Sequence, residues 1–254
     1  MNPDDAVTVE RRMPMPMNNR LWFRDRLTVY MYIPKVACTS LRSFFVQMCE
    51  GKVLSPAQIT DYPYTRLEIE QVKALKQRGV LVVGFVRNPW DRLVSCYRNK
   101  MLADDDAAYY AKQSGDDRDY VDGVFLSFRK FGTFKKGMTF GQFVHAVCEI
   151  PEAQADPHFQ SQYCMLADET GALLPNFLGR FETLNADFNR LCTIYNVKAD
   201  LSHLRPSGSK NYLSYYSPEL IEKVGERYHT DIGLFGYTFD GCPETVDENA
   251  AAVR

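Results

Sequence analysis

Two short stretches of the sequence combine cations, hydroxyl groups and small side chains at spacings that suit the binding of an anion. In the first, "IPKVACTS", an apolar run ends at Pro34, Lys35 follows, and the small residues 37–40 lead into a helical pattern. Small residues let an anion approach the N–H groups at a helix N-terminus, and a lysine adds a mobile positive charge. A capped helix with an exposed lysine gives the same pattern, and the stretch alone slightly favours that simpler interpretation.

The second stretch, "VRNPWDRLVSCYRNK", places Arg87 directly after an apolar run and restrains the following turn with Pro89. The predicted helix after it has one apolar side, formed by Trp90, Leu93, Val94 and Tyr97. Ser95 is therefore expected on the other side, with Arg92 and Arg98 one turn away in either direction. A guanidinium and a hydroxyl group suit a phosphate. For Arg92 and Arg98, a solvated basic face is an equally good interpretation.

Neither stretch is a Walker A loop. The segment with the spacing GxxxxGK[ST] is "GTFKKGMT", residues 132–139, and it has Met138 where the motif needs its lysine. Because that lysine reaches the terminal phosphates of a nucleotide, we reject the match. The sequence also contains no GxGxxG and no HExxH motif.

Each candidate anion site follows a predicted buried strand and precedes a predicted helix. The strands are "LTVYMYI" (27–33) and "VLVVGFV" (80–86), which are apolar on both faces as in a parallel sheet, and the first helix spans about 40–49. A third strand, "NFLGRFE" (176–182), and a helix at 184–195 continue the alternation. Strands that alternate with helices predict an α/β fold with a mostly parallel central sheet. Ligands bind at the carboxyl ends of such strands, so the two anion sites are expected close together.

The rest of the sequence predicts one domain at 26–241, between an N-terminal lead-in (1–25) and a C-terminal tail (242–254). The lead-in contains several Pro, Met and Asn residues and shows no periodicity, as is typical of a flexible segment. The segment 103–136 is charged, aromatic and weakly periodic, and we interpret it as an insertion or a lid.

The composition indicates a globular protein without affinity for nucleic acid. A formal net charge of -2 over 254 residues gives no basic surface of the kind that nucleic-acid binding needs. No run is long and apolar enough to span a bilayer, and residues 1–20 lack the apolar core of a signal peptide. The 7 cysteines, without paired spacing or histidine partners, indicate reduced thiols and no metal site. A cytoplasmic location is therefore expected.

Two anion sites on one sheet suit a ligand with two separate phosphate groups, such as a nucleotide with 5′ and 3′ phosphates, better than a triphosphate. The stretches "IPKVACTSLR" and "VRNPWDRLVSCYRNK" resemble the 5′-phosphosulfate and 3′-phosphate loops of the carbohydrate sulfotransferase family, of the chondroitin, dermatan and HNK-1 type. Three later stretches are similar to further blocks of that family in the same order: "PHFQSQYCML", "LGRFETLNADFNRL" and "YYSPELIEKVGERYHTDIGLFGYTF". The resemblance extends from about Tyr30 to Phe239.

The resemblance implies a three-layer, P-loop-like α/β sulfotransferase fold with a central parallel sheet flanked by helices. It also implies 3′-phosphoadenosine 5′-phosphosulfate (PAPS) as co-substrate, a carbohydrate hydroxyl as acceptor, and no metal. Arg87 and Ser95 would bind the 3′-phosphate. Lys210, in the small-residue loop 205–212, would close over the nucleotide, although a solvated linker is an equally good interpretation of that loop. The residues implied to hold the 5′-phosphosulfate are Lys35, Val36, Ala37, Cys38, Thr39 and Ser40.

The resemblance also implies a general base, because His158 in "DPHFQSQY" aligns with a family histidine beside an aromatic residue. An ordinary loop histidine would have the same sequence surroundings. Of the other histidines, His145 is expected to pack within a helix, His229 ends a predicted helix, and His203 lies in an irregular segment. Lys35 would neutralise the charge of the leaving group, so Lys35 and His158 are the two implied catalytic residues.

Three further polar residues are candidates for orienting the site. Gln162 and Tyr163 follow His158 closely and would orient the acceptor or the imidazole ring. Glu182 follows the third strand and would orient the site or, more simply, cap a helix.

Two other classes of function stay open on the residues alone. A nucleotide-dependent kinase on a related α/β scaffold predicts magnesium dependence and binding of a triphosphate. A binding protein for a phosphorylated nucleotide or an anionic glycan predicts affinity without any labelled product.

Overall fold

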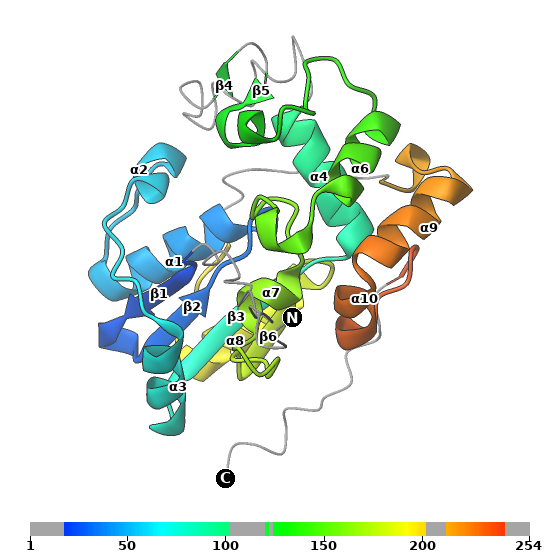
Figure 1. Cartoon of the computed structure of the whole chain (residues 1–254). Coiled ribbons are helices and arrows are strands. Elements are labelled where there is room, and N and C mark those ends of the chain that lie inside the picture. Colours follow the sequence, from blue (N-terminus) through cyan, green and yellow to red (C-terminus); the bar gives the residue numbers. More distant parts are fainter. Residues whose placement is uncertain (1–17, 102–119, 122–123, 202–211, 242–254) are drawn as a thin grey trace, which may run out of the picture.

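The structure, a computed structural model, describes residues 18–101, 120–121, 124–201 and 212–241. Its centre is a four-stranded sheet with the strand order β1-β2-β3-β6 (Figure 1). Strands β2, β3 and β6 run parallel, and β1 pairs antiparallel with β2 at one edge. The three predicted strands are confirmed, each shorter than expected. The bounds are β1 (Arg20–Phe23), β2 (Thr28–Met31), β3 (Leu81–Val86) and β6 (Phe177–Arg180).

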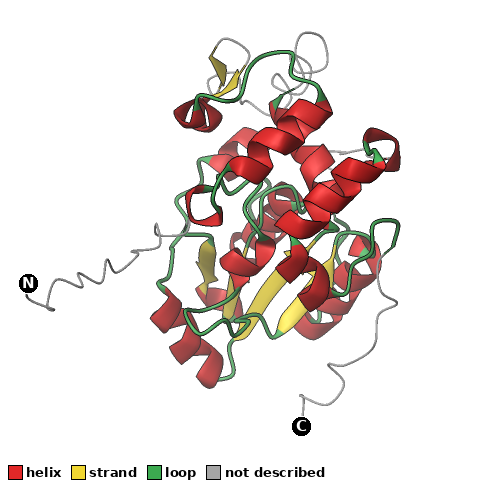
Figure 2. Cartoon of the chain, turned by 45° about the vertical axis from the view of Figure 1, so that its right-hand side comes forward, coloured by secondary structure: helices red, strands yellow, loops and turns green. Residues whose placement is uncertain are grey.

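Helices cover both faces of this sheet, which confirms the predicted three-layer α/β class (Figure 2). On one face, α1 (Cys38–Glu50) packs against α8 (Leu184–Tyr195), and the rings of Phe44 and Phe188 lie 4.8 Å apart. On the opposite face, Gly84 of β3 leaves room for α7 (Gln162–Leu166), since a Cβ at Gly84 would come within 3.3 Å of Leu166. Helix α10 (His229–Phe235) packs against α7 on that face.

The predicted lead-in, residues 1–25, is too long, because its last part forms the edge strand β1. Three of the four residues of β1 are buried, and the strand pairs with β2 along its whole length. Four residues are too few to show the alternation by which a strand is recognised in a sequence. Residues 1–17 and the predicted tail at 242–254 lie outside the described residues.

A second hydrophobic core lies beside the sheet (Figure 1) and is formed by α4 (Pro89–Lys100), α6 (Phe140–Glu149) and α9 (Pro218–Arg227). Phe128 and Phe134 belong to this core and are both buried. They come from the segment 103–136 that the sequence marked as an insertion or a lid. From residue 124 to residue 136, the aromatic residues of that segment therefore contribute to a core.

The shorter elements complete the fold. Strands β4 and β5 pair as a small antiparallel sheet. Within the described part of the chain, no helix has the length and apolarity to cross a membrane. The remaining bounds are η1 (Arg24–Arg26), α2 (Pro56–Thr60), α3 (Ile69–Gln77), β4 (Tyr120–Val121), β5 (Val124–Phe125), η3 (Leu126–Phe131), η4 (Glu152–Gln154) and η5 (Tyr212–Tyr215).

Candidate active site

The loop between β2 and α1 has a backbone that leaves N–H groups without helical partners. Lys35 (φ 71°) and Ala37 (φ 48°) both adopt the left-handed conformation, which costs a non-glycine residue about 1–2 kcal/mol. Ala37 is the N-cap of α1, and its carbonyl accepts the first helical hydrogen bond, from the N–H of Leu41 at 3.0 Å. The N–H groups of residues 38–40 therefore have no carbonyl one turn earlier in the helix. A left-handed residue directly before a helix arranges such groups as a concave anion site.

The helix begins at Cys38, two residues before the predicted start, so all of the predicted small residues lie at its N-terminal turn. Val36 differs from its neighbours, because its side chain is fully buried and its N–H donates to Ile33 O at 3.3 Å. The geometry thus favours the N–H groups of residues 38–40 over that of Val36 for binding an anion. Their role toward a phosphosulfate stays a prediction.

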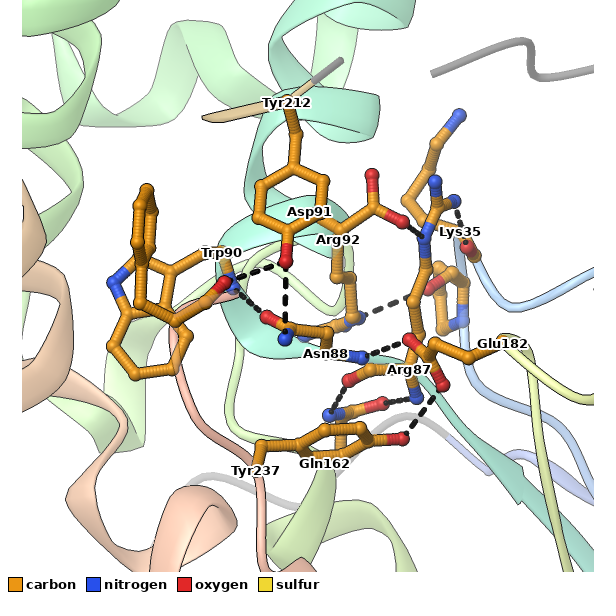
Figure 3. A network of polar contacts seen from close by, with 12 residues as sticks. Lys35, Arg87, Asn88, Trp90, Asp91, Arg92, Gln162, Glu182, Tyr212 and Tyr237 are labelled. Carbon is orange, nitrogen blue, oxygen red and sulfur yellow. Dashed lines mark hydrogen bonds and ion pairs between the residues drawn. The ribbon is translucent and has the colours of Figure 1, made fainter. Parts of the chain in front are cut away.

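Arg87 lies at the carboxyl end of β3, and its side chain is fully buried. Its Nε donates to Asp91 Oδ2 at 2.8 Å, and its Nη1 donates to Lys35 O at 2.9 Å (Figure 3). Its guanidinium carbon lies 3.9 Å from the centre of the Phe181 ring. The two stretches that the sequence marked as separate anion sites are therefore in direct contact.

Ser95 lies one turn after Asp91 on α4, so the two side chains share a face of that helix with the guanidinium of Arg87. All residues of α4 from Pro89 to Tyr97 are buried, and Ser95 is one of them. Arg87 and Ser95 are thus linked through Asp91, which bonds to Arg87 and lies one turn before Ser95 on α4. Their binding of a 3′-phosphate stays a prediction.

The expectation that Gln162 orients the acceptor or the imidazole ring is wrong, because its side chain bonds to Arg87 and Asp231. Its side chain is fully buried and binds both main-chain groups of Arg87 (Figure 3): Oε1 accepts from Arg87 N at 2.9 Å, and Nε2 donates to Arg87 O at 2.8 Å. Asp231 accepts the N–H groups of Gln162 and Tyr163, each at 2.8 Å. Burial raises the pKa of Asp231. Gln162 therefore fixes the end of β3 and has no amide group left over for a substrate.

Glu182 caps a helix, which was the simpler of its two interpretations. Its Oε1 accepts the N–H of Asn88, the N-cap of α4, at 2.6 Å, and its Oε2 accepts from Tyr237 Oη at 3.0 Å. Burial raises the pKa of this carboxyl group. The helix that it caps is α4, whose N-terminus follows the neighbouring strand β3.

Arg92 matches neither of its two interpretations, the anion site or the solvated basic face. Its side chain is 2% exposed, and its guanidinium donates to three backbone carbonyls. A helix side that is polar in sequence is therefore buried in the structure, because the loops that contain Pro34, Pro157 and Gln160 pack against it.

His158 forms a hydrogen-bonded pair with Asp156, which the sequence analysis did not single out. Asp156 Oδ1 accepts from His158 Nδ1 at 2.7 Å and also from the His158 backbone N–H at 3.0 Å. Although burial opposes it, the hydrogen bond from His158 lowers the pKa of Asp156 to about 2. The ionised carboxylate therefore requires the hydrogen on Nδ1 and leaves the lone pair on Nε2. An aspartate two residues before a histidine is the local signal for this turn.

Two lysines place positive charge close to this imidazole. Burial of the ring and the charges of Lys100 and, to a smaller extent, Lys35 lower the pKa of His158 to about 4, against the opposing effect of Asp156. Lys100 is 4% exposed, and its Nζ lies 3.4 Å from the centre of the Phe125 ring. That ring is 5.2 Å from the His158 ring. The imidazole is therefore neutral at pH 7 and lies within electrostatic reach of Lys35.

The other predicted candidates lie away from this pair or outside the described residues. His145 is not packed in the core, since its side chain is 45% exposed. His229 is the first residue of α10, not the end of a helix. Lys210 and His203 lie outside the described residues. Among described residues, no group of three or more His, Cys, Asp or Glu side chains is placed to hold a metal ion.

Comparison with known proteins gives the same family over most of the chain. The model of the sulfotransferase family matches residues 21–238. Carbohydrate sulfotransferase 11 of Rattus norvegicus is 23% identical over 251 residues, which cover 90% of this chain and 68% of that protein. Carbohydrate sulfotransferase 12 of Mus musculus is 23% identical over 257 residues, which cover 86% of this chain and 60% of that protein. No solved structure gives a significant match.

The matched region includes both anion-binding stretches, the strands that carry them and the His158 loop. A parallel sheet ends there in a helix N-terminus with available N–H groups, a lysine, a buried arginine and a neutral imidazole. On these grounds the chain belongs to the sulfotransferase family.

Proposed function

We propose that this protein transfers the sulfuryl group of PAPS to a hydroxyl group of a carbohydrate. The family supports sulfuryl transfer with PAPS as the co-substrate, and the printed names of the relatives support a carbohydrate acceptor. The observation that carries the proposal is geometric: the guanidinium of Arg92 donates both to Pro34 O, directly before Lys35, and to Pro157 O, directly before His158. The loops that carry a cation for the leaving group and a base for the acceptor are therefore bonded to the same side chain.

On the donor side, the N–H groups of residues 38–40 and the ammonium group of Lys35 would bind the 5′-phosphosulfate. The acceptor oxygen forms a bond to sulfur, while the bond between sulfur and the bridging oxygen breaks. That oxygen leaves with the 3′,5′-bisphosphate and gains negative charge, which Lys35 would neutralise. A fixed donor at such a position contributes about 3–4 kcal/mol to catalysis.

On the acceptor side, His158 Nε2 would take the hydroxyl proton as the new bond forms. Asp156 fixes the tautomer that leaves Nε2 able to accept it. The rings of Phe125 and Phe128 pack edge-on against the imidazole, at 5.2 Å and 6.2 Å, and restrict its rotation. With a pKa of about 4 the imidazole is unprotonated at neutral pH and able to accept a proton, as a weaker base than an ordinary histidine.

The test is transfer of radioactive sulfate from labelled PAPS to a panel of oligosaccharides, with Lys35→Ala as the inactive control. Calorimetry with adenosine 3′,5′-bisphosphate and with ATP, each in the absence and in the presence of magnesium, accompanies it. We expect binding of the bisphosphate and a labelled oligosaccharide. Magnesium-dependent binding of ATP would support a kinase instead. Bisphosphate binding without any labelled product across the panel would support a binding protein.

A further inference from the structure

A single buried guanidinium, that of Arg92, connects two loops that are far apart in the sequence. Its Nε donates to Pro34 O at 3.1 Å, in the loop that carries Lys35. Its Nη1 donates to Gln160 O at 2.6 Å and its Nη2 donates to Pro157 O at 2.8 Å. Pro157 and Gln160 flank His158. Each nitrogen of the guanidinium is thus bonded to the backbone of one of the two loops.

These bonds leave Arg92 without a direct role toward a substrate. The side chain is 2% exposed, and burial lowers its pKa, an effect that Tyr228 and Asp231 oppose. Burying a cation costs several kcal/mol unless its donors are satisfied. Here each of the three nitrogens donates to a carbonyl group, which fixes the planar guanidinium in one orientation.

The loop around His158 has other supports among the described residues, and just beyond it Gln162 bonds to the main chain of Arg87, whose side chain reaches Lys35 O. Tyr228 Oη donates to Phe159 O at 2.6 Å, and the N–H groups of Phe159 and Gln160 donate to Asp156 O. These contacts hold the loop internally and against α9. The position of the His158 loop relative to the Lys35 loop depends on Arg92, whose side chain bonds directly to both loops.

We propose that Arg92 is a positioning residue that sets the distance between Lys35 and His158 by bonding to both of their loops. The inference rests on the proposed function, in which these two residues act on one transferred group. In-line transfer needs the leaving group, the sulfur and the acceptor oxygen aligned, and a misplacement of about 1 Å costs on the order of a hundredfold in rate.

The test compares Arg92→Lys with Arg20→Lys as the matched control. Arg20 is also buried and also donates to a backbone carbonyl, from Nε to Leu67 O at 2.7 Å, but on the edge strand β1. Lysine keeps the charge in both variants but has one nitrogen instead of the three of a guanidinium. Hydrogen exchange of the backbone amides then reports on both loops without any need for turnover.

In Arg92→Lys we expect faster amide exchange in both loops, at Val36 in the first and at Phe159 and Gln160 in the second. In Arg20→Lys we expect unchanged exchange in both loops. We expect kcat to fall by roughly tenfold to a hundredfold, with a smaller loss of affinity for adenosine 3′,5′-bisphosphate. If Arg92→Lys does not fold, Arg92→Gln gives the same comparison. Unchanged exchange at Val36, or wild-type kcat, would overturn the proposal. Absence of sulfation by the wild type would contradict the proposed function, and the exchange data would still decide whether Arg92 joins the loops.

Discussion

Arg87 Nη1 donates a hydrogen bond to the backbone carbonyl of Lys35 at 2.9 Å, so a side chain at the end of β3 fixes the backbone after β2. The same guanidinium is held by Asp91 and lies on the ring of Phe181. Lys35 has a left-handed backbone, which costs free energy unless its surroundings fix it. The hydrogen bond from Arg87 supplies part of that restraint. A change at Arg87 therefore alters the Lys35 loop as well as its own surroundings.

Replacing Lys35 with alanine should nearly abolish turnover and leave the fold intact. The loss corresponds to about 3–4 kcal/mol of transition-state stabilisation if the ammonium group neutralises the leaving oxygen. The measurement is kcat at saturating PAPS, with circular dichroism as the check on folding. Lys52→Ala, at an exposed lysine just past the other end of α1, is the control and should keep wild-type turnover. Wild-type kcat in Lys35→Ala would remove Lys35 from the mechanism.

Replacing Arg87 with alanine should weaken the binding of a 3′-phosphate by roughly 1.5–3 kcal/mol. Calorimetry with adenosine 3′,5′-bisphosphate and with 5′-AMP measures this, because only the first ligand carries the group. Arg87→Ala also leaves the Asp91 carboxylate buried without its partner, so we expect lower stability too. The double variant Arg87→Ala/Asp91→Ala removes that carboxylate and separates the two effects. An equal loss for both ligands would contradict the assignment to the 3′-phosphate.

His158→Ala should lower kcat on the order of a hundredfold to ten-thousandfold and leave nucleotide affinity almost unchanged. The pH–rate profile should lose its acidic limb, since no imidazole is left to be protonated. His145→Ala, on the exposed side of α6, is the control. Asp156→Ala should reduce kcat less than His158→Ala, because it removes the group that fixes the tautomer and not the base. Survival of the acidic limb in His158→Ala would place the base elsewhere.

Lys100→Met should move the acidic limb of the profile to higher pH. The charge of Lys100 lowers the pKa of His158, which is about 4, so its removal raises that pKa toward the ordinary value of about 6.5. Above the new pKa the imidazole is neutral as before, and kcat near pH 8 should therefore change little. The shift is measured by the dependence of kcat on pH. A limb that stays in place would show that Lys100 has no effect on the base.

Ala37→Gly and Ala37→Val should have opposite effects on stability. Ala37 has a φ of 48°, a conformation that glycine adopts freely and a β-branched residue avoids. We expect Ala37→Gly to be neutral or stabilising by up to about 1 kcal/mol, because relief of strain offsets the extra freedom of the unfolded chain. Ala37→Val should be destabilising. Urea denaturation measures both, and a large loss of stability in Ala37→Gly would contradict the strained backbone.

The sequence by itself determined the parts of this protein that depend on local pattern. Buried strands at 27–33 and 80–86 can be recognised in the sequence because a parallel strand is apolar on both faces. The helices after them are recognised by apolar residues at helical spacing. The loop at 34–40 is readable for the same reason, since a proline, a lysine and small residues follow one another directly. The pairing of Asp156 with His158 was also local, although it was missed.

Only the tertiary structure decided what surrounds the polar residues. Arg92 looks like a surface residue in the sequence, and its burial follows from the two distant loops, at Pro34 and at Pro157 and Gln160, that pack against its side of α4. Gln162 lies 75 residues from Arg87 and still binds both of its main-chain groups. Contacts between residues so far apart in the sequence depend on how the sheet and helices pack, and the periodicity of the sequence does not predict them. That packing brings Lys35 and His158 to one site.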